Sequence, residues 1–278
     1  MEHGSRGRDG ALMPQLEIQL IAVVAAVACA LPGAFLVLRR VSMLSDAISH
    51  SILPGIVLAF LITEDLNSPL LILGAAATGV VTAGVIETLS RTGRVREDAA
   101  IGLVFPILFS IGVILIARYA GGVHLDVDAV LLGELAFAPF NRLEFGGMDA
   151  GPKALWVMGA ILLANLAFIA IFFKELKLST FDPALAAALG FSPTLLHYLL
   201  MGSVSLTAVG AFDAVGSVLV VALIVGPPAT AYLLTDKLST LLALSAGIGA
   251  TAAISGYWAA HLADASIAGS IATAVGLL

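Results

Sequence analysis

The sequence contains little charge and almost no cysteine. Only 12% of its 278 residues are charged and 60% are hydrophobic, whereas a soluble domain carries about a quarter charged residues. A water-soluble globular protein is therefore excluded, because its surface would lack polar groups. The single Cys29 lies in an apolar run, which excludes a disulfide or a thiolate cluster within the chain and is typical of a small packed hydrophobic residue.

Several catalytic and binding motifs are also missing. The chain has no Gly-x-Ser-x-Gly nucleophile turn, no His-Glu-x-x-His zinc motif and no basic patch interleaved with aromatic residues. None of its four lysines follows a glycine, so it lacks the Gly-x-x-x-x-Gly-Lys phosphate loop. We therefore expect no enzyme activity, no cofactor and no nucleic-acid partner. Any ATP hydrolysis that drives the chain belongs to a separate subunit.

The apolar residues come in blocks of about 20, the length that crosses a hydrocarbon core of ~30 Å as a helix. Because backbone groups find no partners in lipid, these blocks must be helical. The predicted spans are Glu17–Leu38, Ser42–Thr63, Ser68–Leu89, Ile101–Arg118, Ala154–Phe173, Thr194–Phe212, Val215–Leu234 and Ser239–Trp258. The sequence predicts an all-α, polytopic membrane protein with eight or nine transmembrane helices. We expect a disordered tail over residues 1–15 and one transmembrane domain over residues 16–278.

Two stretches depart from this pattern. Ala120–Lys153 is mixed in polarity and holds a short apolar piece, Ala129–Phe140, whose length predicts a re-entrant or interfacial helix. The last apolar run, Ile267–Leu278, is only about half a membrane deep.

Basic residues predict how the chain is oriented. Eight of the 13 fall in loops that the predicted spans place on one side, namely Arg39, Arg40, Arg91, Arg94, Arg96, Lys174, Lys177 and Lys237. Loops rich in Lys and Arg face the cytoplasm. The long 120–153 connection is therefore expected outside.

One face of the second span is polar. At about 100° per residue, an arc of about 140° holds Ser42, Ser45, Asp46, Ser49 and His50. The opposite arc is mainly apolar. Such a polar face is not stable against lipid, so we expect it to face other helices or a watery pathway.

Asp46 and His50 are four residues apart, so their side chains lie on one helix face a turn apart. A carboxylate oxygen and an imidazole nitrogen at that spacing can hold one divalent ion, with zinc, manganese and iron(II) favoured over magnesium or calcium. Pro54-Gly55, a turn later, is predicted to loosen the helix and free a carbonyl. A structural hydrogen bond between helices and a proton relay without metal are the other interpretations. Two ligands are too few, so others would come from other helices, a partner subunit or water.

Other polar residues are weaker candidates. His124 and Asp126, in the connection expected outside, would collect cations at an entrance, although a solvated acidic loop is the simpler interpretation. Glu87, near a helix end, is predicted to snorkel or to pair with an arginine. His197 is interpreted as a polar residue at the start of a helix.

The connection before Pro193 predicts a short helix. Asp182 followed by Pro183 is typical of an N-cap and first helical residue. Residues 184–189 are strong helix formers, and Gly190 is a natural C-cap. We expect this helix in the cytoplasm, where its small alanines let a partner approach closely. A connector lying on the membrane is the alternative.

Three stretches together resemble the permeases of metal-cation ABC importers for manganese, zinc and iron. They are the segments 38–55, 181–190 and 215–231, and the likeness extends from about Glu17 to the end of the chain. The most specific feature is Ser-x-x-x-Asp-x-x-x-His followed by Pro-Gly. Gly226-Pro227-Pro228 departs from the family's usual single proline, which alters a kink at most. The family continues beyond Leu278, so we expect a truncated C-terminus.

The resemblance implies a function that spacing does not show. It implies that Asp46 and His50 contact the transported metal ion, which is cargo and not a cofactor. It implies that segment 181–190 is a coupling helix docking on a cytoplasmic ATPase. The coupling residues are Phe181, Asp182, Pro183, Ala186 and Gly190. The implied assembly is an importer in the inner or plasma membrane, with two identical or related permease chains, two ATPase chains and an external metal-binding protein.

Two other functions stay open at this point. An ABC permease for a chelated metal or siderophore would share the ATPase coupling but would not need an intramembrane Asp–His pair. A proton-coupled secondary transporter would use the pair as a relay and would need no ATPase.

Overall fold

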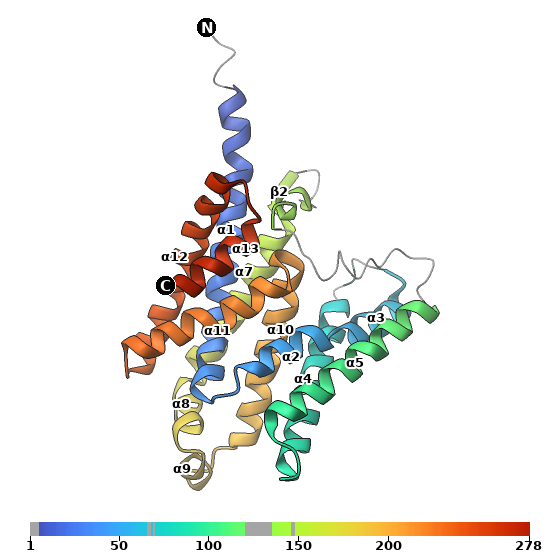
Figure 1. The fold of residues 1–278 in the computed structure, drawn as a ribbon, viewed down its shortest axis with the longest axis vertical. Helices are drawn as coiled ribbons and strands as arrows, with labels where there is room; N and C mark the ends of the chain where they lie inside the picture. Colours follow the sequence, from blue (N-terminus) through green and yellow to red (C-terminus); the bar gives the residue numbers. More distant parts are fainter. Residues whose placement is uncertain (1–5, 66–67, 69, 120–134, 146–147) are drawn as a thin grey trace.

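The computed structural model describes residues 6–65, 68, 70–119, 135–145 and 148–278. It is a bundle of helices with one small hairpin (Figure 1). Its elements are α1 (Arg6–Leu38), α2 (Met43–Ser51), α3 (Leu53–Thr63), α4 (Leu70–Arg91), α5 (Glu97–Tyr119), a 3₁₀ turn (Ala138–Phe140), β1 (Arg142–Phe145), β2 (Met148–Pro152), α7 (Lys153–Ile171), α8 (Phe173–Phe181), α9 (Pro183–Ala188), α10 (Pro193–Val215), α11 (Ser217–Leu234), α12 (Leu238–Ala263) and α13 (Ile267–Leu277).

Within the described residues, eight segments are long and apolar enough to cross a membrane, with α2 and α3 together forming one of them. The prediction of an all-α polytopic protein with eight or nine spans is therefore confirmed. The apolar helix α13 has 11 residues, about half the length that a span requires.

The structure differs from the sequence prediction at several boundaries. Helix α1 begins at Arg6, within the stretch assigned to a tail. The connection before α9 holds a further helix, α8, which is separated from α7 by a break at Phe172. The strands β1 and β2 pair antiparallel in a stretch for which no strand was predicted. Of the predicted interfacial piece 129–140, only residues from 135 on are described, and they form turns and the 3₁₀ helix.

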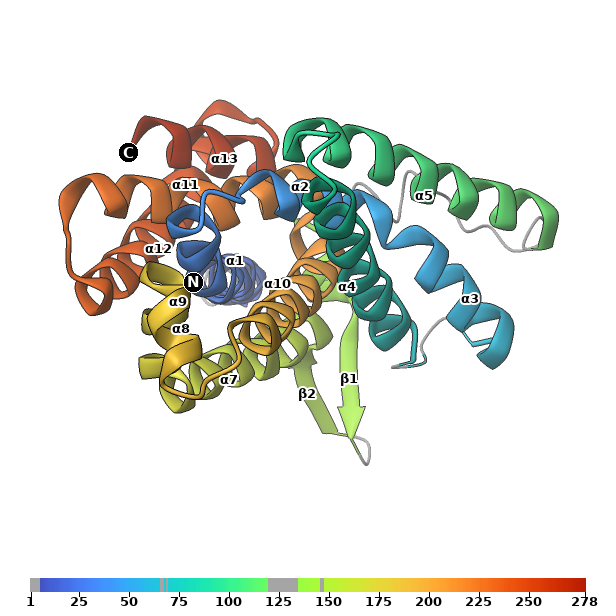
Figure 2. The ribbon, with the colours of Figure 1, turned by 90° about the horizontal axis from the view of Figure 1, so that it is seen from below.

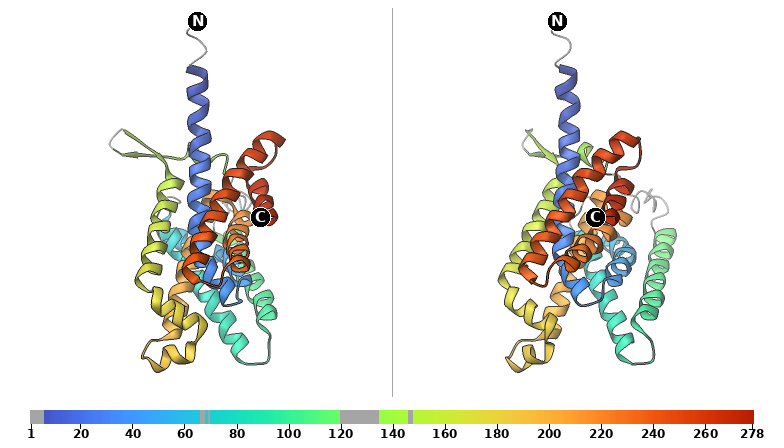
Figure 3. Two further views of the ribbon diagram at one scale, coloured as in Figure 1. Left: turned by 90° about the vertical axis from the view of Figure 1, so that its left-hand side faces the viewer. Right: turned by 60° about the vertical axis from the view of Figure 1, so that its left-hand side comes forward.

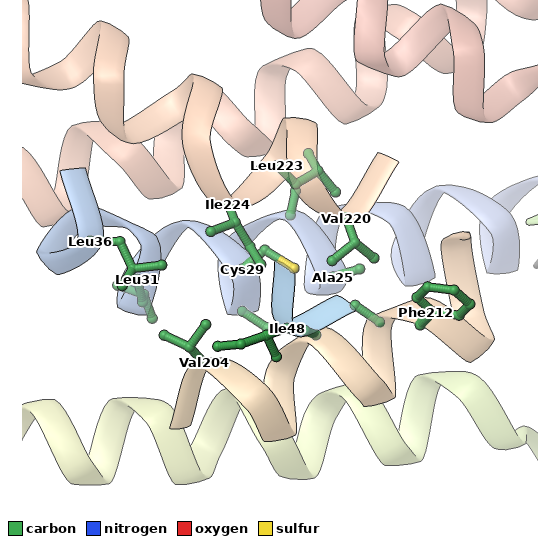
Figure 4. Close-up of a cluster of buried hydrophobic side chains, with 14 of the residues drawn as sticks. Ala25, Cys29, Leu31, Leu36, Ile48, Val204, Phe212, Val220, Leu223 and Ile224 are labelled. Carbon is green, nitrogen blue, oxygen red and sulfur yellow. The ribbon is translucent and has the colours of Figure 1, made fainter. Parts of the chain in front are cut away.

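Helix α10 lies in the middle of the bundle. Seen end-on, α3, α4 and α5 lie on one side of it, and α1, α11, α12 and α13 lie on the other (Figure 2). Helix α1 packs against α7, α10, α11 and α12, so it is largely buried. Ile48 of α2 reaches into the core between Cys29 of α1 and Val204 of α10 (Figure 4). This apolar anchor fixes α2 by the face opposite Asp46 and His50.

The basic loops gather at one end of the molecule. The end of α1, the α4–α5 turn, and α8 with α9 lie in the lower part of Figure 1, and the α11–α12 turn lies toward the same end. The start of α1 and the hairpin lie at the opposite end, as the side views in Figure 3 also show. We call the lower end, which carries Arg39, Arg91 and Lys174, the basic end. The shared placement of these loops agrees with the orientation predicted from the basic residues.

The second span is broken between α2 and α3, as Pro54-Gly55 predicted. Helix α2 ends at Ser51 and α3 begins at Leu53. Pro54 has no N–H, so it offers no donor to the carbonyl four residues earlier, that of His50. Gly55 lies against the backbone of Gly74 in α4, where any Cβ would overlap it. The break therefore lets α3 approach α4 closely while α2 keeps its own direction.

Candidate functional site

Asp46 and His50 face each other on α2. The Nε2 atom of His50 lies 3.4 Å from Oδ1 of Asp46, and their side chains are 35% and 41% exposed, in the order His50 and Asp46. They line a pocket of about 220 Å³ together with Ser217, Val218 and Val221 of α11. A water molecule occupies about 30 Å³ of liquid. The pocket therefore has room for an ion that keeps part of its water shell.

The polar face predicted on α2 divides into two parts. Ser45 and Ser49 are buried, and their hydroxyls donate to backbone carbonyls of the same helix, at 2.7 Å to Ser42 and 2.8 Å to Ser45. Ser51, the polar exception on the opposite arc of α2, forms a buried 2.7 Å hydrogen bond with Thr82 of α4. The serines of this face therefore meet other parts of the bundle, as the sequence allowed, whereas Asp46 and His50 line the pocket. Helices α4, α5, α10 and α11 pack on α2, and this packing buries the serines while Asp46 and His50 stay partly exposed.

The pair supplies one imidazole nitrogen and one carboxylate. In the part of the chain that the structure describes, no group of three or more His, Cys, Asp and Glu side chains comes together as a metal site. Among the described residues, further ligands would be carbonyls or hydroxyls, and water or another chain are other sources. The ring of Phe105 in α5 lies 6.0 Å from that of His50, measured between centroids.

The structure places two of the four remaining polar candidates. His124 and Asp126 lie outside the described residues. Glu87 pairs with Arg91, with 2.6 Å between Oε1 and Nη2, which confirms the predicted arginine pairing. Its Oε2 lies 3.7 Å from Nε2 of His197, so His197 is more than a polar helix end. Spacing gave no sign of this contact, because the two residues are far apart in the sequence.

The short helix at the basic end forms as predicted. Oδ1 of Asp182 accepts a 2.9 Å hydrogen bond from the backbone N–H of Leu185, and Pro183 is the first helical residue. Gly190 adopts φ +88°, the left-handed conformation that ends a helix at low cost in glycine. The N-cap and C-terminal assignments from the sequence are confirmed.

Three apolar side chains around α9 point outward. Phe181, Leu185 and Leu189 are 59%, 46% and 61% exposed, and we call them the apolar α9 face. Ala186 is buried, so it packs inward and does not belong to this face. Leu185 and Leu189 were not singled out from the sequence. Leu185 and Leu189 are four residues apart, the spacing that marks one helix face, whereas Phe181 is the last residue of α8.

Comparison with known proteins assigns a family to this bundle. The ABC 3 transport family matches residues 15–278. The chain is 54% identical over 263 residues to the zinc transport system membrane protein TroD of Treponema pallidum (strain Nichols), an alignment that covers 95% of this chain and 71% of TroD. It is 49% identical over 255 residues to the manganese transport system membrane protein MntD of Bacillus subtilis (strain 168), covering 92% of this chain and 86% of MntD.

A solved structure agrees with this assignment. PsaBC from Streptococcus pneumoniae, in complex with Fab, contains a chain that superposes with a TM-score of 0.76 at 30% identity, covering 94% of this chain and 87% of that one. The eight apolar segments and the match over nearly the whole sequence lead to one conclusion. The chain belongs to the ABC 3 transport family and is a multi-pass membrane permease subunit.

Proposed function

We propose that this permease forms the path of an ATP-driven importer for manganese or zinc, and that Asp46 and His50 bind the ion in transit. The observation that carries the proposal is the Asp46–His50 pair in a pocket of about 220 Å³ inside a membrane span. An ionisable pair within a span is costly unless it serves transport or ligand binding. The names of TroD and MntD, which specify zinc and manganese transport, support the choice of ion.

The proposed binding is weak and transient. An ion crosses only if protein groups replace part of its water shell, and it leaves only if no single site holds it tightly. One imidazole and one carboxylate, both partly exposed, meet the two requirements. The nitrogen suits zinc, whereas the hard oxygen accepts manganese or iron(II) as well.

Movement of the ion is driven from the basic end, which we assign to the cytoplasm. The apolar α9 face, formed by Phe181, Leu185 and Leu189, docks on a separate ATPase subunit. Asp182 holds the N-terminus of α9 in place, and Pro183 and Gly190 set its two ends. Ala186, being buried, supports the helix from within.

A second permease chain and an external metal-binding protein complete the proposed transporter. ATP binding alternates the bundle between outward- and inward-facing forms, and the external protein supplies affinity. An importer for a chelated metal has no need of the Asp46–His50 pair. A proton-coupled transporter has no need of an exposed apolar α9 face. Both features are present in this chain.

The test is uptake of radioactive manganese and zinc into vesicles carrying the permease with its ATPase and binding protein. Asp46→Ala and His50→Ala are expected to reduce ATP-dependent uptake by at least the roughly 10–100-fold that losing an outer-shell partner of a metal site costs. Association with the ATPase stays intact. The matched controls are His261→Ala and Asp264→Ala, an exposed histidine and carboxylate on and just after α12, which keep wild-type uptake.

Three results would contradict the proposal. Normal uptake by both site variants would reduce the pair to a helix contact. Uptake of a metal chelate but not of the free ion would support the chelate importer. Uptake driven by a proton gradient without ATP would support the secondary transporter.

A further inference from the structure

Arg39 connects the end of α1 to the segment that leads into α9. Its Nε donates to the hydroxyl of Thr180 and its Nη2 to the hydroxyl of Ser179, each at 3.1 Å. These two residues form the last turn of α8, directly before Phe181. Burial lowers the pKa of Arg39 to about 10, so its guanidinium remains charged at neutral pH. A movement of α8 and α9 therefore acts directly on the end of α1.

The same guanidinium also contacts α10. Nη1 of Arg39 lies 3.4 Å from Nδ1 of His197. A guanidinium can only donate, so Nδ1 is the acceptor and the ring proton of the neutral imidazole is on Nε2. Nε2 points at Oε2 of Glu87 in α4, 3.7 Å away. Oε2 is buried and has no hydrogen-bond partner among the described residues.

The gap between His197 and Glu87 can close. A donor and an acceptor 3.7 Å apart are about 0.8 Å beyond the usual hydrogen-bond length. Beside them, an open groove of about 470 Å³ runs along the basic half of α4, with Tyr198 of α10 at its edge. The His197–Glu87 pair therefore borders an open flank of two helices that pack together further along their length. A small approach of α10 toward α4 would supply the missing partner of Oε2.

Helix α4 in turn holds α2. The hydroxyls of Thr82 and Ser51 form a buried 2.7 Å hydrogen bond. Thr82 lies five residues before Glu87 on α4, and Ser51 directly follows His50 on α2. A displacement at the basic end of α4 therefore reaches the residue next to the proposed ion ligand.

We propose that Arg39, His197 and Glu87 form a positioning relay that passes movement of the apolar α9 face to α4 and α2. The inference rests on the proposed function. It assigns these three residues the task of coupling ATP hydrolysis to the position of Asp46 and His50. They touch no ion themselves, and the His197–Glu87 contact closes in one of the two transport states.

A second cation site at the basic end does not explain these contacts. His197 and Glu87 alone resemble a ligand pair, but Arg39 lies against the imidazole and Arg91 against the carboxylate. Two guanidinium charges within contact distance oppose a divalent cation. The arrangement suits an ion-pair network that changes length with conformation.

The test measures ions taken up per ATP hydrolysed by the complete transporter in vesicles. The variants are Glu87→Gln, His197→Gln, their double variant, and Arg39→Lys, which keeps the charge but loses the planar fork. Each single variant is expected to lower the ratio about fivefold or more, a usual size for coupling between sites. ATPase association and the thermal midpoint stay at the wild-type level. The exposed Arg94→Gln, just after the same end of α4, is the control.

The double variant separates a relay from independent structural effects. In a relay, Glu87→Gln adds nothing once His197 is replaced, whereas independent effects multiply. The relay is overturned if the single variants keep an ion-per-ATP ratio within about twofold of wild type. It is also overturned if the loss in the double variant is the product of the two single losses. If Arg39→Lys fails to assemble, the Glu87–His197 cycle decides alone. A wild type that takes up no metal refutes the proposed function itself, whereas a transporting wild type with unchanged variants refutes only the relay.

Discussion

At the scale of single residues, the identity of the position 50 side chain should set which ion is preferred. Imidazole favours zinc, whereas carboxylate oxygen accepts manganese readily. Replacing the nitrogen by a second oxygen in His50→Asp is expected to raise the ratio of manganese to zinc uptake by about tenfold, the change that 1.4 kcal/mol produces. Competition between the two ions for uptake measures the ratio. An unchanged ratio of manganese to zinc uptake would show that ligands elsewhere determine selectivity. The control is His261→Asp, at an exposed site, which should leave the ratio unchanged.

Asn165 is a second residue whose role can be tested alone. Its Nδ2 donates to the carbonyl of Ala28 in α1 at 3.1 Å and to Thr207 of α10 at 2.7 Å. Its Oδ1 accepts from Ser203 at 2.8 Å. Every polar atom of this buried side chain is thus engaged, and three helices meet there.

Asn165→Leu is expected to lower the free energy of unfolding by about 0.6–2 kcal/mol, the range for hydrogen bonds between membrane helices. Denaturant unfolding in detergent checks the value. Thr88→Val is the matched control, because the exposed Thr88 hydroxyl donates to the carbonyl of Gly84 in its own helix and so does not join two helices. Equal losses in both variants would mean that Asn165 does not join the helices.

At the scale of elements, the β1–β2 hairpin is held by charge. Arg142 lies 2.6 Å from Asp149 of β2 and 3.1 Å from Glu17 of α1, measured between nitrogen and oxygen atoms. The hydrogen bond from Arg142 and that from the Gly151 backbone hold the pKa of Asp149 below its usual value. A carboxyl with a lowered pKa stabilises the folded state above its unfolded pKa and loses that effect as the pH falls through the lowered value.

The hairpin should therefore stay attached at neutral pH and loosen only below about pH 4, the ordinary range of an aspartate. Amide hydrogen exchange in residues 149–151, corrected for its intrinsic pH dependence, measures the attachment. Arg142→Gln is expected to raise the rate of amide exchange in the hairpin already at neutral pH. The control is Arg118→Gln, which changes a basic residue at the end of α5. Exchange that ignores both the pH and the Arg142 change would contradict this role.

Elements differ in how far the sequence determined them in advance. The long spans were predictable because lipid forces uniform apolar blocks into helices. The ends of α9 were predictable because Asp182, Pro183 and Gly190 have strong local preferences. The hairpin was not, because its anchor to Glu17 is a contact between residues 125 positions apart. The division of the α2 face was also hidden, since only packing decides that Ser45 and Ser49 are covered and Asp46 is not.

At the scale of the whole molecule, ion binding at the Asp46–His50 pocket and ATPase binding at the apolar α9 face should be lost independently of each other. The Asp46–His50 pocket lies within a span, whereas the apolar α9 face lies at the basic end. The proposed relay links the two surfaces, but no residue belongs to both of them. A variant of one surface therefore leaves the binding property of the other intact.

Leu185→Glu places a charge in the middle of the apolar α9 face, where Leu185 is 46% exposed. Because the site is open in the isolated permease, we expect the chain to fold with a thermal midpoint near that of the wild type. A buried unpaired carboxylate at the interface costs several kcal/mol, so ATPase association is expected to weaken more than about 100-fold. Co-purification and binding titration of the ATPase measure this loss. Leu262→Glu, exposed at the far end of α12, should leave association unchanged. Asp46→Ala should bind the ATPase normally and yet show the reduced metal uptake expected of a site variant. Normal ATPase binding by Leu185→Glu would show that the ATPase docks elsewhere.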